Sequence, residues 1–187
     1  MESKNKAWVK RAAVIAVAAL SALALFSFYR FAERRWLYPL GYAEHVEKYA
    51  EAFGLESSLV YALIKTESGF DAGAESGKGA KGLMQLTDAT AAFIASKFKV
   101  ADYDVFDAET NVAFGCYYLW YLTKKFSHPA TVLAAYNAGE GNVSLWLKDD
   151  RYSPDGVRFS LIPYKETENH VRKTLRFQEK YQKIYNL

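Results

Sequence analysis

Apolar residues recur along most of this chain at intervals of three and four, which is the spacing of one helix face, and no stretch sustains the alternation typical of strands. The first such segment after the N-terminal forty residues covers 42–53, and Gly54 follows it as a helix-ending residue. A second starts at Ser57 or Ser58, either of which can cap its N-terminus, and stops at Gly69. The pattern predicts a domain that is all-α or nearly so.

The helical pattern continues in the second half of the chain. A long segment that Asp107 can cap is apolar on nearly all sides, so we expect it to be the central, buried helix. Two shorter helices are expected on either side of it: one over 89–98, capped by Thr87 or Asp88, and one over 130–137, after His128-Pro129. A turn flanked by Gly139 and Gly141 then precedes an element over 143–147, and a polar loop covers 149–155. The final helix has Pro163 at its first position and ends near Tyr185.

Glycine is concentrated in one segment. Residues 69–82 hold five of the chain's eleven glycines, which predicts a loop or a short irregular hairpin. Such a loop either lets a ligand approach the backbone closely or serves as a flexible connector, and both interpretations stay open at this point.

An uninterrupted run of 18 residues without a charge, 12–29, precedes the globular part. At about 1.5 Å per residue it spans roughly 27 Å, close to the thickness of a hydrocarbon core. A cleaved signal peptide with an Ala-Leu-Ala site at 22–24 is the alternative, but apolar residues continue past that site to Tyr29. We therefore interpret 12–29 as an uncleaved transmembrane helix that follows a short tail, 1–11.

Charge indicates how this single-pass chain is oriented. Four clustered basic residues precede the apolar run and three follow it, which favours a cytoplasmic tail and an extracytoplasmic domain over 40–187. A juxtamembrane linker over 30–39 joins the two parts. Residues 1–38 carry a net charge of +5 and the remainder −2, so the excess positive charge belongs to the anchor. We therefore expect no nucleic-acid partner.

The chain has one cysteine and three histidines. Cys116 lies in an apolar run and is expected to be a small core residue, and an intramolecular disulfide is impossible. No histidine has a metal-ligand spacing to another. We predict neither a metal site nor a cofactor.

Glu67 is the carboxylate that the pattern singles out. It lies three, four and seven residues after Ile64, Leu63 and Val60, so it continues the apolar face of its helix. It also ends that helix, where the helix dipole disfavours negative charge. Desolvation and the dipole together favour the protonated form, which a general acid requires. Taken alone, the pattern also fits a solvent-exposed glutamate paired with a lysine.

Four short blocks follow one another in the domain: Glu67-Ser68-Gly69-Phe70, Gly82-Leu83-Met84-Gln85-Leu86, Ala135-Tyr136-Asn137-Ala138-Gly139, and Ile162-Pro163-Tyr164 with Glu166-Thr167. In this order, with Ser76 nine and Gln85 eighteen residues after Glu67, they resemble the soluble-lytic-transglycosylase family of peptidoglycan-cleaving enzymes. The resemblance covers roughly 40–180. It implies an all-α, lysozyme-like fold with at most a short irregular hairpin.

The resemblance also implies roles for single residues. Glu67 matches the family's single catalytic acid and base, and Tyr136 with Asn137 matches a pair that lies over the reacting sugar. The other positions implied to bind substrate are Ser76, Met84, Gln85, Thr90 and Glu166. Taken singly, Gln85 also fits a surface amide, Tyr136 a core aromatic residue, and Glu166 an acid that complements a helix dipole.

The sequence departs from the family pattern at two places. After its Gly-Leu-Met-Gln block the family commonly continues with an apolar residue and proline, whereas this chain has Thr87-Asp88. Before a valine in the last block the family often has tyrosine, and here His170 precedes Val171. The first change adds a carboxylate near the cleft floor, which affects sugar contacts more than the chemistry.

A site with one carboxylate suits the family's reaction, because glycoside hydrolysis usually needs two. The resemblance implies that Glu67 protonates the oxygen leaving N-acetylmuramic acid, so that the β-1,4 bond to N-acetylglucosamine breaks. The same residue then deprotonates the muramyl C6 hydroxyl, which closes a 1,6-anhydro ring without consuming water.

The leading hypothesis is therefore a membrane-anchored lytic transglycosylase that acts on peptidoglycan glycan strands in cell-wall remodelling. Two alternatives stay open. One is a lysozyme-type hydrolase, and the other is a wall-binding module without catalysis that docks envelope-assembly proteins.

Overall fold

The structure, a computed structural model, describes the backbone of residues 2–187 and the side chains of Trp8 and of residues 10–187. Within this range it contains helices, and its β pairing is confined to isolated antiparallel bridges from Lys81 to Glu75 and to Leu86. The prediction of an all-α fold is therefore confirmed, and the glycine-rich segment is an irregular, hairpin-like loop. The chain divides into two compact units between Leu40 and Gly41.

The N-terminal unit consists of α1 (Glu2–Ala32) and a π-helical turn, η1 (Glu33–Leu37). The segment Lys10–Leu37 is long and apolar enough to cross a membrane, a test that signal sequences also pass. Its large apolar side chains are exposed. Arg30 donates a 2.8 Å hydrogen bond to the buried carboxylate of Glu33. Helical structure thus continues through most of the segment that the sequence assigned to a linker.

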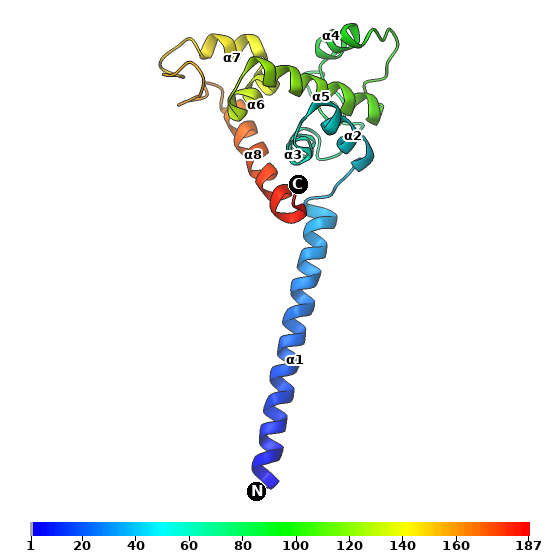
Figure 1. Ribbon diagram of the computed structural model, residues 1–187, viewed down its shortest axis with the longest axis vertical. Coiled ribbons are helices and arrows are strands. Elements are labelled where there is room, and N and C mark those ends of the chain that lie inside the picture. The colour runs from blue at the N-terminus through cyan, green and yellow to red at the C-terminus, as the bar shows by residue number, and fades with distance from the viewer. Residues whose placement is uncertain (1) are drawn as a thin grey trace. The chain divides into compact units, whose positions relative to one another are not determined.

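The C-terminal unit is a bundle of helices arranged around α5 (Ala108–Lys125). α5 packs against α2 (Ala43–Phe53), α4 (Asp88–Phe98) and α6 (Pro129–Ala138), and α4 and α7 (Glu140–Trp146) lie at its opposite ends (Figure 1). The long α8 (Lys165–Tyr185) packs against α6 and α3 (Ser57–Glu67).

The core confirms the expected central position of α5. Its side chains Val112, Cys116, Leu119 and Leu122 are fully buried. Burial raises the pKa of the Cys116 thiol, so this cysteine is protonated at neutral pH. The prediction that it is a small core residue is confirmed.

Helix ends confirm three of the predicted caps. Gly54 adopts the left-handed conformation, with φ of 62°, and ends α2. The side chains of Thr87 and Asp107 accept hydrogen bonds from the amides of Thr90 and Thr110, which satisfies first-turn donors of α4 and α5.

Three predicted boundaries are wrong. Neither Ser57 nor Ser58 caps α3; the cap position belongs to Glu56, and the Ser57 hydroxyl instead donates to Glu47. Pro163 does not start α8, because Tyr164 holds the N-cap position and the first helical residue is Lys165. Gly141 flanks no turn, since it lies inside α7, and Gly139 alone, with φ of 84°, separates α6 from α7.

The glycine-rich loop between α3 and α4 is attached to α5 by one side chain, Asn111. Its amide nitrogen donates to the carbonyls of Lys81 (3.0 Å) and Val105 (2.7 Å), and its amide oxygen accepts a 2.7 Å bond from the Met84 amide. Asn111 is 1% exposed, so these three bonds satisfy a buried polar group that would otherwise oppose folding. The loop is therefore fixed in place and is not a flexible connector.

Gly82 lies at this attachment and cannot carry a side chain without strain. Its φ is +75°, and a Cβ there would lie 2.9 Å from the Val105 carbonyl oxygen and against the Asn111 amide. We expect Gly82→Ala to lower the free energy of unfolding by roughly 2 to 4 kcal/mol, through the left-handed backbone and the steric overlap. Urea unfolding of the full chain in detergent measures this.

Gly77→Ala is the matched control, because a Cβ at Gly77 meets no atom within 4 Å and its φ is not left-handed. It should change the free energy of unfolding by less than about 0.5 kcal/mol. Equal effects of the two substitutions would contradict the attachment of the loop at Gly82.

Candidate active site

Glu67 is the last residue of α3, as its position on the apolar face predicts. Val60, Leu63 and Ile64 on that face are fully buried, whereas the Glu67 side chain is 13% exposed. The helix ends there because Gly69 takes φ of +64° and the Ser68 hydroxyl donates a 2.8 Å bond to the Leu83 carbonyl. The carboxylate thus emerges from the core at a fixed point.

Glu67 lines a cavity of about 450 Å³. Its walls come from α3, the glycine-rich loop, α6 and the start of α8. The side chains and backbone around it belong to Glu67, Ser76, Gly77, Lys78, Ala80, Gln85, Thr87, Tyr136, Asn137 and Glu166. Six residues that the resemblance assigns to one site are therefore brought together, although up to 99 positions separate them in the chain.

Tyr136 connects α6 to the loop beneath the cavity. Its hydroxyl donates a 2.8 Å hydrogen bond to the Met84 carbonyl. Burial, together with the nearby charge of Glu67, raises the pKa of Tyr136 well above its ordinary value. Tyr136 is therefore neutral at physiological pH, so its phenol adds no negative charge beside the Glu67 carboxylate.

Two loop residues present polar groups to the cavity. The amide nitrogen of Gln85 donates to the carbonyls of Ala74 (3.1 Å) and Gly82 (3.0 Å), which leaves the amide oxygen as its acceptor for a ligand. Gln85 holds a left-handed backbone, with φ of 49°. The Ser76 hydroxyl accepts a 3.0 Å bond from the Ala80 amide and closes the turn of the loop.

One hydrogen bond joins α6 to α8 in the cavity wall, and an exposed ion pair lies at the edge of that wall. The Thr167 hydroxyl donates to the Asn137 amide oxygen at 2.8 Å, so the Asn137 amide nitrogen remains as a donor for a ligand. The Glu166 carboxylate, 70% exposed, pairs with the Lys78 ammonium at 2.9 Å. This pair joins the loop to α8 at the mouth of the cavity.

Met84 and Thr90 do not line the cavity, and their expected contact with substrate stays a prediction. The Met84 side chain is fully buried and packs against Gly115, so only its backbone takes part, as the acceptor for Tyr136. The Thr90 hydroxyl is 2.9 Å from that of Thr87, inside the first turn of α4.

The extra carboxylate expected near the cleft floor, Asp88, has a lysine partner. Thr87 lines the cavity, whereas Asp88 does not and forms an ion pair with Lys81 at 2.8 Å.

His170 contacts Glu67, and the sequence analysis did not predict this contact. Its Nε2 lies 2.8 Å from Oε1 of Glu67, and its side chain is 8% exposed. The two residues are 103 positions apart, so no local pattern joins them. The available signal was the departure from tyrosine at this position. Lys78 and Thr167 were likewise missed as partners of Glu166 and Asn137.

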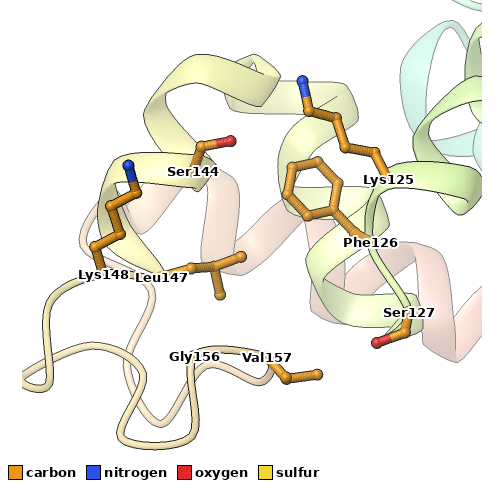
Figure 2. A pocket seen from close by; sticks show the side chains of 8 residues that line it. All are labelled: Lys125, Phe126, Ser127, Ser144, Leu147, Lys148, Gly156 and Val157. Atoms are coloured by element: carbon orange, nitrogen blue, oxygen red, sulfur yellow. The ribbon is translucent and has the colours of Figure 1, made fainter.

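A second hollow, of about 330 Å³, lies between the end of α5, α7 and the loop that follows α7 (Figure 2). Figure 2 shows Phe126 facing Leu147 across it, with Lys125 and Lys148 at its edge. It shares no residue with the Glu67 cavity and has no carboxylate in its lining. This hollow therefore offers no carboxylate for acid–base chemistry. Among the described residues, no three potential metal ligands come together.

The pKa of Tyr136 predicts a pH dependence of folding. Below pH 10 the phenol keeps its proton in both states, whereas above it the unfolded chain loses the proton and the folded chain retains it. Stability should then fall as pH rises above 10, by up to about 1.4 kcal/mol per pH unit from this residue. Urea unfolding between pH 9 and 11 measures the slope.

In Tyr136→Phe the free energy of unfolding should fall less steeply with pH over the same range, because phenylalanine has no proton that the unfolded chain can lose. The other buried tyrosines contribute equally to both proteins, so the difference isolates Tyr136. Identical slopes would contradict the retained proton.

Comparison with known proteins agrees with this geometry. The family model described as the transglycosylase SLT domain matches residues 44–158. The soluble lytic murein transglycosylase of Escherichia coli K12 is 32% identical over 150 residues, which cover 77% of this chain and 23% of that protein. The membrane-bound lytic murein transglycosylase C of Serratia proteamaculans is 33% identical over 135 residues, which cover 65% of this chain and 38% of that protein.

The solved structures that resemble this chain are also lytic transglycosylases. An inactive mutant of the lytic transglycosylase Slt from Pseudomonas aeruginosa superposes with a TM-score of 0.69 at 30% identity, over 80% of this chain and 25% of that one. The 70 kDa soluble lytic transglycosylase of Escherichia coli gives 0.70 at 29% identity, over 78% and 25%. The chain thus spans about a quarter of the length of these soluble relatives. By its sequence, its helical fold and its assembled site, the chain belongs to the transglycosylase SLT domain family.

Proposed function

We propose that this chain is a membrane-anchored lytic transglycosylase. It cleaves the β-1,4 bond between N-acetylmuramic acid and N-acetylglucosamine in peptidoglycan and leaves a 1,6-anhydromuramyl end. The observation that carries the proposal is the position of Glu67, a single sheltered carboxylate at the end of a buried helix face and at the wall of a polar cavity.

The other carboxylate that lines the cavity is poorly suited to be a second catalytic group. Glu166 is 70% exposed and is paired with Lys78 at the mouth. A hydrolase of the usual type needs a nucleophile or a base held opposite the acid. Because Glu166 is largely exposed at the mouth of the cavity, the arrangement favours a reaction in which Glu67 acts twice and the substrate supplies the nucleophile.

The reaction balances with Glu67 alone. Its proton passes to the glycosidic oxygen as the bond from that oxygen to C1 of the muramyl sugar breaks. The carboxylate then takes the proton of the C6 hydroxyl while C6 oxygen bonds to C1. Glu67 ends protonated as it began, and no water is consumed.

The cavity also suits sugars that carry N-acetyl groups. Gln85 offers an amide oxygen and Asn137 an amide nitrogen, and both are held by hydrogen bonds on their other side. An acetamido group has one donor and one acceptor, so it can pair with both kinds of group. Much of the rate would come from this positioning, because the attacking hydroxyl belongs to the substrate.

Glu67→Gln tests the mechanism. The full chain in detergent is incubated with purified peptidoglycan, and soluble products are analysed by mass spectrometry. We expect anhydromuropeptides from the parent and a loss of at least about a thousandfold in their rate of release from the variant, since the amide can supply no proton.

Glu75→Gln is the matched control, because Glu75 is exposed and lies outside the cavity lining, and it should retain the parent's activity. Products one water heavier, with reducing muramic ends, would replace the proposal by a hydrolase. Binding to peptidoglycan without any product would replace it by a wall-binding module.

The proposal also covers the location of this activity at the membrane. We propose a cytoplasmic tail over 1–11, a span over 12–29, a linker over 30–39 and an extracytoplasmic domain over 40–187, with a role in cell-wall remodelling beside envelope-assembly proteins. Support comes from the long apolar helix with exposed side chains and from a relative that is named membrane-bound. An extracytoplasmic domain is also on the side of the wall glycan.

The uncleaved span predicts that the full 187-residue mass is recovered from washed membranes, whereas signal cleavage would give a shorter, soluble chain. Leu20→Arg puts a charge near the centre of the span at a cost of about 3 kcal/mol, so it should reduce the membrane-bound fraction. Leu37→Arg, at the end of the helix, should leave that fraction nearly unchanged.

A further inference from the structure

The contact between His170 and Glu67 has a specific geometry. His170 lies in the first turns of α8 and reaches the end of α3, where its Nε2 is 2.8 Å from Glu67 Oε1. Both side chains are largely buried. At this distance one proton lies between nitrogen and oxygen, and its donor is either the ring or the carboxylic acid.

The other ring nitrogen decides between these two cases. Nδ1 of His170 is buried and has no hydrogen-bond partner among the described residues. A buried N–H without an acceptor is costlier and rarer than a buried acceptor without a donor. The proton of a neutral ring therefore belongs on Nε2, where it meets the Glu67 oxygen. An imidazolium ring would leave a charged Nδ1–H unpaired, so burial also opposes the doubly protonated form.

We propose that His170 is a positioning residue that acts as a neutral hydrogen-bond donor to Glu67. Its Nε2–H donates to Oε1 throughout the reaction, and Oε2 of Glu67 gives and takes the proton. This inference rests on the proposed function and adds to it the partner that orients the acid.

One donor on Oε1 serves both forms of Glu67. The carboxylic acid, with its proton on Oε2, still accepts at Oε1. After it has protonated the leaving oxygen, the carboxylate accepts a stronger, charge-assisted bond from the same N–H. The bond thus stabilises the charge that develops during cleavage, and the ring changes neither its proton nor its orientation.

This role also accounts for histidine at a position where tyrosine is usual in the family. A phenol presents one O–H donor to the carboxylate, and a neutral imidazole with its proton on Nε2 presents one N–H. An imidazolium would instead bring a positive charge that holds Glu67 ionised and unable to act as an acid.

Hydrogen bonds next to His170 join α8 to α3. The Thr174 hydroxyl, fully buried, lies 2.9 Å from the His170 carbonyl and 3.0 Å from the Thr66 hydroxyl. The Thr66 hydroxyl in turn donates to the Ala62 carbonyl at 2.8 Å. The register between α8 and the end of α3 is therefore set one turn from the His170 side chain.

Few charged groups surround the pair. α3 contributes Lys65 as well as Glu67, and burial and Lys173 of α8 lower the pKa of Lys65. α6 contributes Tyr136, whose pKa is raised. On α8 itself the neighbours along the chain are Glu166, which pairs with Lys78, and Lys173, whose ammonium is 3.4 Å from the Thr66 carbonyl.

Three substitutions in the full chain test the role by kinetics. His170→Gln and His170→Tyr keep a donor at this position, and His170→Phe keeps a ring without one. We expect kcat of the Phe variant to fall about ten- to a hundredfold with KM nearly unchanged, as for a lost bond to a charged group, and the other two to stay within about fivefold of the parent. Thermal unfolding of each variant separates loss of folding from loss of the donor.

The pH profile separates a neutral donor from a titrating ring. Between pH 5 and 8 the proposal predicts that the profiles of kcat for the parent and His170→Gln have the same shape, because the proposed donor keeps one proton on its ring throughout. Loss of an ionisation step in the Gln variant would overturn the proposal, as would full activity of His170→Phe.

A spectroscopic test is independent of the reaction. Nitrogen-15 NMR of the histidine rings shows which nitrogen carries the proton, and the His170→Gln spectrum assigns the signal among three histidines. We expect a proton on Nε2 alone at pH 6 to 7, in the parent and in Glu67→Gln. Protonation of both nitrogens in the parent, or of Nδ1 alone, would overturn the proposal. If the parent released no glycan product, the proposed function would fail, while the NMR result would still decide the hydrogen bond.

Discussion

The buried amide of Asn111 is the constraint on which the rest of the site depends. A polar side chain inside an apolar helix must find partners, and Asn111 finds all three in backbone groups at Lys81, Met84 and Val105. The loop between α3 and α4 is thereby fixed to the central helix. Because Tyr136 then bonds to the carbonyl of Met84, α6 is attached to the same loop. The loop and α6, which form two walls of the cavity, are therefore held in position without a ligand.

Electrostatics at the site follow from this attachment. Glu67 lies at the C-terminal end of α3, where the helix dipole adds negative potential, so the site must keep other negative groups away. Tyr136 stays neutral because its pKa is raised, and Glu166 is paired with Lys78. Nε2 of His170 on α8 lies 2.8 Å from the Glu67 carboxylate. Glu67 is thus the one sheltered carboxyl group in the lining of the cavity.

The sequence predicts those features that depend on neighbouring residues. Gly54, Thr87 and Asp107 end or cap helices through bonds within one turn, and all three were correctly predicted. The burial of α5 and the direction of the α3 apolar face follow from spacing alone. Identification of the cavity residues needed the order of four family blocks, since spacing gives no distance between Glu67 and Tyr136.

Other features depend on tertiary packing and were missed for that reason. Met84 belongs to a family block, yet its side chain packs against Gly115 and only its carbonyl serves the site. Asn111 appears in the sequence as one polar residue in an apolar helix, which is normally a surface position. His170 was visible only as a departure from tyrosine, and its contact with Glu67 arises from the packing of α8 on α3.

The ion pair at the mouth of the cavity has a consequence for access to Glu67. Lys78 and Glu166 join the loop to α8, and both side chains are more than two-thirds exposed. Such a pair contributes only about 0 to 1 kcal/mol and is weakened by salt, so thermal motion opens it readily. Opening of the pair separates the loop from α8 at the mouth and widens the entrance to the cavity.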